Sequence, residues 1–186
     1  MRKVTRALML LAALPLAGCW EAKTSLYGGA RPLQPLGTGK VIGLNSDKKE
    51  SEHSVLTREA GGAYRLTNDE KGSSDFGDSF AVRFFSFRGA PSGVLIFEAQ
   101  ERKNCKPGDT NCTQDPMYYY GLAKVKSGSA EVVNPDCDKD SATAKMPGVA
   151  AGDYGTCTFT DRATLEKAML ALSQEPWKPQ VTYTLQ

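Results

Sequence analysis

Residues 79–87 read Ser-Phe-Ala-Val-Arg-Phe-Phe-Ser-Phe, and this stretch decides the fold class of the chain. Aromatic and β-branched residues favour a β-strand. Residues 88–93 then supply turn residues, two glycines and a proline among them, and residues 94–100 form a second apolar run. The pattern predicts two strands joined by a turn.

Both faces of the first strand are apolar. Alternate side chains of a strand point to opposite faces. Each face therefore receives three apolar side chains, Phe80, Val82 and Phe84 on one and Ala81, Phe85 and Phe87 on the other. A sheet with two apolar faces has to be covered on both sides, or it has to curl on itself.

The remaining patterns are mostly short strands followed by one helix. Strand patterns recur at 40–44, 54–60, 63–67, 117–126, 130–134, 156–159 and 181–185. The helix is indicated by apolar residues at i, i+3, i+4 and i+7, which are Leu165, Ala168, Met169 and Leu172, with Thr160 or Asp161 as N-cap. The sequence therefore predicts an α+β, mainly β fold. Its antiparallel sheet has about seven or eight strands, sandwich or barrel-like, with one C-terminal amphipathic helix.

The N-terminus is organised like an export signal. Residues 2–6 contain three cations and no acid, and residues 7–17 are apolar. This run is shorter than the roughly 20 apolar residues of a membrane-spanning helix, and the pattern is typical of a secretory signal peptide. It ends in Leu16-Ala17-Gly18-Cys19, which resembles the lipobox of bacterial lipoproteins.

This resemblance implies that residues 1–18 are removed and that Cys19 carries acyl chains, so that a membrane is the first partner we expect. Trp20, rather than an aspartate, follows the cysteine, which favours the outer membrane, with the protein facing the periplasm. Residues 19–39 contain two prolines and four glycines, and we predict a flexible tether there. Residues 40–186 are predicted to form a single domain that resembles no characterised family.

Four cysteines remain after Cys19, and they are Cys105, Cys112, Cys137 and Cys157. An even number in an oxidising compartment predicts two disulfides, for which sequence alone leaves three pairings open. We favour the pairs that are neighbours in sequence, 105 with 112 and 137 with 157. The spacing contains no Cys-x₂₋₄-Cys element, which argues against a zinc site.

The charge of the chain argues against a nucleic-acid partner. Residues 1–18 hold three cations and no acid, so their removal lowers the formal net charge from +2 to −1. No excess of positive charge then remains to neutralise phosphates.

No stretch carries a catalytic motif, and we expect neither a cofactor nor a metal. His53 is the only histidine and lies in a polar segment, without a nucleophile motif beside it. The acids Asp136, Asp138 and Asp140 have the spacing that opens a calcium loop, but the glycine and glutamate that an EF-hand needs are absent. A second acidic group is interpreted as a solvated loop, with Asp69, Glu70, Asp75 and Asp78. Glu98 and Glu131 fall within strands and are expected to face outward.

One pattern suggests a binding surface. If Tyr119 points into the core, Tyr118 and Tyr120 point the other way, and paired exposed aromatics suit a protein or sugar contact. The leading hypothesis is thus a non-catalytic, membrane-anchored envelope lipoprotein that contacts another envelope protein. The two-faced strands also suggest a small-molecule-binding barrel, and the acid-rich loops suggest an envelope hydrolase. A closed sheet with an apolar void would favour the second hypothesis, and converging carboxylates would favour the third.

Overall fold

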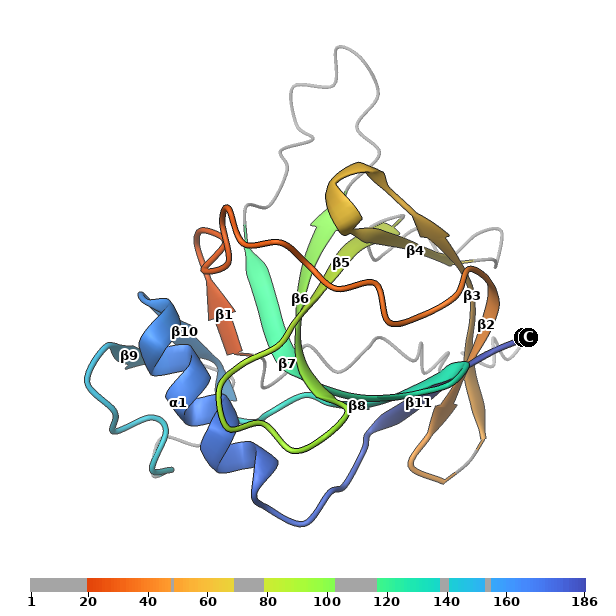
Figure 1. Cartoon of the computed structure of the whole chain (residues 1–186). Helices are drawn as coiled ribbons and strands as arrows, with labels where there is room; N and C mark the ends of the chain where they lie inside the picture. Colours follow the sequence, from red (N-terminus) through yellow and green to blue (C-terminus); the bar gives the residue numbers. More distant parts are fainter. Residues whose placement is uncertain (1–19, 48, 69–78, 103–116, 138–140, 153–154) are drawn as a thin grey trace, which may run out of the picture.

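The computed structural model confirms the predicted mainly β fold with a single helix, and it selects the barrel over the sandwich (Figure 1). It describes residues 20–47, 49–68, 79–102, 117–137, 141–152 and 155–186. Eight strands make the barrel: β2 (Gly39–Asn45), β3 (Glu50–Arg58), β4 (Tyr64–Asn68), β5 (Ser79–Phe85), β6 (Val94–Arg102), β7 (Tyr118–Lys126), β8 (Ser129–Val133) and β11 (Val181–Leu185).

The barrel is an antiparallel meander in which each strand pairs with the one before it. The last strand, β11, pairs with β8 on one side and with β2 on the other, and this second pairing closes the ring. Closure removes the sheet edges that an open sheet would expose. The predicted hairpin at residues 54–67 is confirmed as β3 and β4, joined by the 3₁₀ turn η1 (Ala60–Gly62), where Gly61 has a φ of 77°.

The first apolar face of residues 79–87 lines the barrel interior. Phe84 packs there against apolar side chains from the other strands, and Leu66 and Val125 join from half-buried positions. The buried members of this inner core are Leu36, Val41, Leu56, Tyr64, Phe84, Ala123 and Ala130. The curling that the sequence required has therefore taken place.

The second apolar face of the same strand is covered from outside. Three short strands, β1 (Trp20–Ala22), β10 (Cys157–Phe159) and β9 (Val149–Ala151), extend the sheet beyond β7, and α1 (Arg162–Ser173) packs across them. Together they form an outer core with Phe85 and Phe87. Both solutions that the two-faced strand allowed, curling and covering, are present in one molecule.

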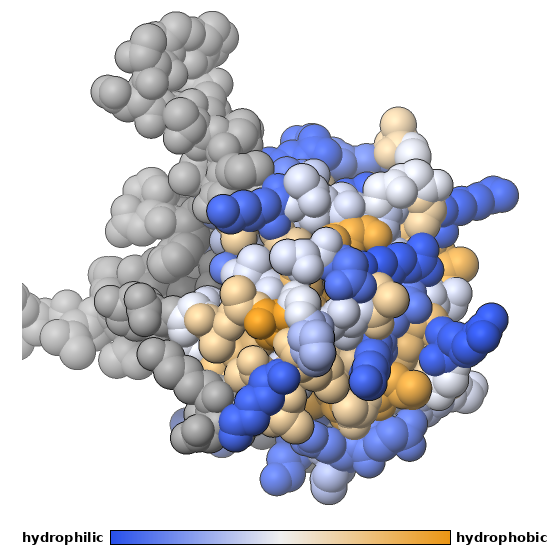
Figure 2. Space-filling view, turned by 90° about the vertical axis from the view of Figure 1, so that its left-hand side faces the viewer, coloured by the Kyte–Doolittle hydropathy of each residue, from blue (hydrophilic) through white to orange (hydrophobic). Residues whose placement is uncertain are grey.

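The helix follows its sequence pattern closely. Leu165, Ala168 and Met169 are fully buried in the outer core, and Leu172 packs against it. The Asp161 side chain caps the helix by accepting a hydrogen bond from the Thr164 N–H at 2.8 Å, which confirms one of the two expected caps. On the side of the molecule that carries α1 and β9, hydrophilic side chains are scattered among apolar ones (Figure 2). None of the described helices is long and apolar enough to cross a membrane.

The prediction of a flexible tether is wrong for the described part of residues 19–39. Trp20 pairs with Tyr120 of β7 and with Cys157 of β10, and only 2% of its surface is exposed. Tyr27 and Leu36 are buried as well. Trp20 and Tyr27 pack into the outer core and Leu36 packs into the inner core, and this burial outweighs the loop-forming tendency of the glycines and prolines.

Candidate functional site

The barrel interior contains an apolar cavity of about 100 Å³. Its walls come from all eight barrel strands, from Leu36, which precedes β2, and from Gly128 and Asn134, which flank β8. The lining is almost wholly apolar, with Val41, Leu56, Leu66, Phe80, Val82, Phe84, Phe97, Ala99, Ala130, Val132 and Leu185 as its aliphatic and phenyl members. Apolar cavities of this kind stay dry and accept apolar guests.

The residues that line the cavity are spread along the barrel axis. The cavity touches Phe80, Val82 and Phe84 on the same strand. Residues four apart in a strand are separated by about 13 Å, and the tilt of barrel strands reduces this to roughly 10 Å along the barrel axis. The cavity, which we call the slot, therefore has wall residues over roughly 10 Å of the barrel axis.

The segment between β1 and β2 closes one end of the barrel. Leu36 has only 8% of its surface exposed, and both of its backbone groups are bonded to one phenol. The Leu36 N–H donates to Tyr64 Oη at 3.0 Å, and Tyr64 Oη donates to the Leu36 carbonyl at 2.7 Å. Upstream, the Leu33 N–H donates to the Phe84 carbonyl at 2.8 Å. Leu36 is thus fixed at the end of the lumen.

A buried acid on the outer face of the barrel holds the start of the same segment. Glu98 points outward, as expected, but it is only 1% exposed. Its Oε1 lies 2.6 Å from Arg83 Nη2 on the neighbouring strand β5. Its Oε2 accepts hydrogen bonds at 2.8 Å from Tyr120 Oη and from Ser25 Oγ. The charge of Glu98 is therefore compensated by one cation and two hydroxyl groups.

Tyr27 and Tyr120, both buried beside a glutamate, stay protonated and act as donors. Burial, reinforced by the nearby Glu98 charge, raises the pKa of Tyr120 far above its ordinary value. Burial, reinforced by Glu166, raises the pKa of Tyr27 in the same way. Tyr27 stacks on Phe85 with ring centroids 4.2 Å apart and donates to Glu166 Oε1 of α1 at 3.0 Å. The N-terminal segment is thus locked to both the barrel wall and the helix.

Comparisons with known proteins add nothing to this geometry. No protein family, curated protein or solved structure matches the chain.

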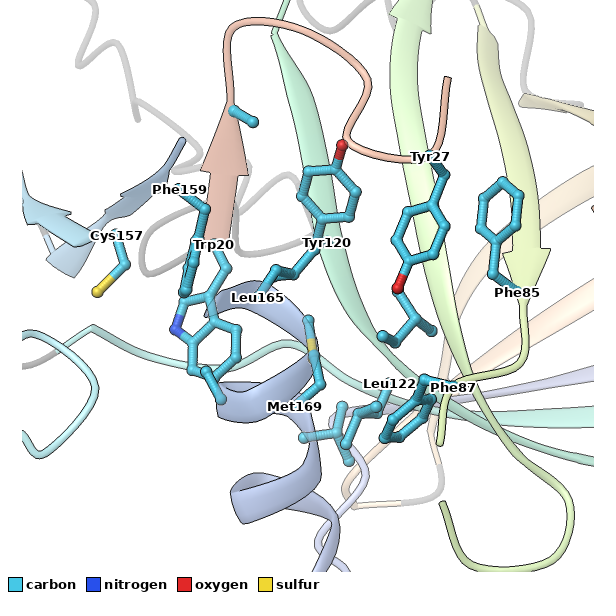
Figure 3. Close-up of a cluster of buried hydrophobic side chains, with 14 of the residues drawn as sticks. Trp20, Tyr27, Phe85, Phe87, Tyr120, Leu122, Cys157, Phe159, Leu165 and Met169 are labelled. Atoms are coloured by element: carbon cyan, nitrogen blue, oxygen red, sulfur yellow. The ribbon is translucent and has the colours of Figure 1, made fainter. Parts of the chain in front are cut away.

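The structure separates the three tyrosines as the alternation predicted, but it does not leave the expected surface exposed. Tyr119 lines the cavity, Tyr118 and Tyr120 pack in the outer core, and Tyr120 also contributes to the cavity wall. Tyr120 is 1% exposed, because β1 and the segment after it cover its ring, and Tyr118 is half-buried against the outer core. Figure 3 shows Tyr120 among the outer-core side chains, beside Tyr27 and Leu165. The proposed contact surface is therefore wrong for Tyr120.

One of the two disulfides is present as predicted. Cys137 and Cys157 are bonded, with their Cα atoms 5.3 Å apart, and both are fully buried. Cys19, Cys105 and Cys112 lie outside the described residues, so their predicted lipid and disulfide remain predictions. His53 is exposed on β3, and Asp136 is exposed. Asp69, Glu70, Asp75, Asp78, Asp138 and Asp140 also lie outside the described residues.

The acids that the structure describes in ion pairs are dispersed and each faces a cation. Glu98 pairs with Arg83, and Glu131 pairs with Lys126 at 2.7 Å, which lowers the pKa of Glu131. Glu59 and Glu166 pair with arginines elsewhere, Arg65 and Arg162. Among the described residues no three potential metal ligands converge. This arrangement gives no support to chemistry by paired carboxylates.

Sequence reasoning offered a binding barrel as an alternative without naming the residues that line its cavity, and it missed the Glu98 network. The signal for the network was present, because an acid within the run Val-Leu-Ile-Phe-Glu-Ala (94–99) is unusual for an apolar strand. Its partners could not be inferred, since Ser25 is 73 residues away in sequence. The cavity left no comparable signal, because large apolar residues line it as they would line a filled core.

Proposed function

We propose that this protein is a lipid-anchored envelope protein whose barrel binds a small apolar molecule in its lumen. The observation that supports the binding role is the apolar cavity inside a closed barrel. The contact-surface hypothesis is less well supported, because the tyrosine that motivated it is covered.

The volume of the cavity limits what it can hold. Pockets for drug-sized ligands measure roughly 300–1,000 Å³. A cavity of about 100 Å³ is smaller than that, and it is closer to the ~150 Å³ apolar cavity that accepts benzene. The ligand is therefore a thin or small apolar group, and a bulky polycyclic molecule does not fit.

The anchor is the second part of the proposal, and it rests on the lipobox at residues 16–19. Trp20 lies in β1, one residue after the cysteine that would carry the acyl chains. Consecutive Cα atoms are about 3.8 Å apart, so the anchor would sit beside the sheet with no tether between them. Palmitate labelling of the expressed protein, absent from a Cys19→Ser variant, is the expected result. Equal labelling of both would remove the anchor.

The binding role predicts that filling the cavity weakens binding. Ala130 is 3% exposed and lines the cavity, so Ala130→Leu places three further carbons inside the slot. Each buried CH₂ contributes about 0.8 kcal/mol, so the loss of affinity should be roughly tenfold or more. We would measure it by calorimetric titration with n-alkanols. The protein would be the mature chain, residues 19–186, made as Cys19→Ser so that no acyl group competes.

The matched control is Ala171→Leu, which adds the same three carbons at an exposed position of α1. We expect it to bind like the parent protein. Overpacking costs about 1–3 kcal/mol, so circular dichroism and thermal unfolding have to show that Ala130→Leu is folded. Equal n-alkanol binding by a folded Ala130→Leu protein and by the control would exclude the lumen as the site.

A further inference from the structure

The cavity has a fixed stop at one end. Leu36 contributes to the cavity wall, but it belongs to no barrel strand, since β2 begins at Gly39. Its backbone N–H and carbonyl are both held by Tyr64 Oη, and Arg58 Nη2 also donates to the carbonyl at 3.3 Å. The Leu36 side chain therefore closes the lumen from a position that the barrel wall itself enforces.

A linear guest can lie along the residues of β5 that line the slot. An opening that follows one strand from Phe80 to Phe84 with only about 100 Å³ of volume suits an extended hydrocarbon chain. Its walls are apolar along this length, with Val82 on the same strand and Phe97 on the neighbouring strand β6. A chain that lies along the slot meets Leu36 at the closed end.

We propose that the apolar ligand is a linear alkyl chain and that Leu36 sets the longest chain that the lumen accepts. This inference rests on the proposed binding function and names the substrate class of that same cavity. Each CH₂ that stays buried raises the affinity about fourfold, until the chain reaches Leu36. Beyond that length a further CH₂ has to remain in water or displace the Leu36 side chain, so the affinity stops rising. We call the chain length at which the affinity stops rising the optimum.

The test measures n-alkanol affinity against chain length by calorimetry, on the same mature Cys19→Ser chain. Leu36→Ala removes three carbons from the stop, and the optimum should move to chains two or three carbons longer. Leu36→Val removes one carbon and should move the optimum by about one, which keeps the test open if the alanine variant does not fold. A leucine on the same segment provides the control: Leu33 is 42% exposed and does not line the cavity, so Leu33→Ala should leave the optimum unchanged.

The two possible failures are distinct. If the parent protein binds n-alkanols and the folded Leu36 variants keep its optimum, the role of Leu36 is refuted and the binding function stands. If the parent protein binds no n-alkanol of any length, the linear-chain assignment is refuted. Binding of a compact guest such as benzene would then still support the lumen as the site, whereas its absence as well would remove the proposed function.

Discussion

Glu98→Ala should lower the free energy of unfolding by about 3–5 kcal/mol, which is the range for removing one partner of a buried ion pair. Glu98 is 1% exposed. Its carboxylate forms an ion pair with Arg83 and accepts hydrogen bonds from Tyr120 and Ser25. The substitution leaves the Arg83 charge without its partner and removes the acceptor of two hydroxyl groups. Because Arg83 is itself 29% exposed and can turn to water, we expect a value near the lower limit.

Denaturant unfolding of the purified protein measures this change, and the sheet provides a control. Glu131→Ala breaks the exposed pair with Lys126, whose side chain is 59% exposed, and it should cost about 1 kcal/mol or less. A double variant, Arg83→Met with Glu98→Leu, should recover much of the loss, since it replaces both charges with apolar groups. Equal effects of Glu98→Ala and Glu131→Ala would show that burial of the Glu98 pair does not matter.

The fold class was predictable because one stretch carried the decisive constraint. The two apolar faces of residues 79–87 demanded curling or covering, and the structure does both. The choice between sandwich and barrel was not predictable. It depends on the pairing of β11 with β2, which joins residues about 140 apart in sequence and leaves no local pattern.

The two ends of the N-terminal segment, Trp20 and Leu36, show why local sequence patterns wrongly predicted a flexible tether there. Trp20–Ala22 is too short to show an alternating pattern, and glycines and prolines follow it. Its pairing with β7 and β10 depends on surfaces that exist only once the barrel is closed. Leu36 is similar, because nothing next to it in sequence indicates that Tyr64 will hold it over the lumen. Tertiary contacts override local propensity at both places.

The sequence suggested a binding barrel, but it could not decide whether the barrel interior is filled. The residues that line the cavity were predictable as core, since Phe80, Val82 and Phe84 share one face of their strand. Whether such a core is filled depends on the sum of side-chain volumes against the barrel radius, and a difference of a few methyl groups decides it. Residue types alone do not contain that difference.

Loss of the disulfide should have the second large effect, and it should be local. Cys137→Ala with Cys157→Ala opens a loop of 20 residues, for which the chain-entropy account gives about 3 kcal/mol. Cys157 lies in β10, which pairs with β9 and β1, and Phe159 of the same strand packs on Trp20 with ring centroids 5.1 Å apart. Hydrogen exchange should therefore accelerate most in β9, β10 and β1.

The barrel supplies the internal reference for this experiment. β3 and β4 contribute no residue to the outer core, so the amide hydrogen exchange that occurs in them by local opening should change little. The affinity for n-alkanols should persist as well. The thermal midpoint should fall by several degrees, since roughly 3 kcal/mol is a large change for a domain of this size. Exchange that rises equally in β3 and β10 at conditions where the protein stays folded would contradict the division into two cores. It would mean that the outer sheet and the lumen form a single cooperative unit, in which the covering of the barrel and the shape of its cavity cannot vary independently.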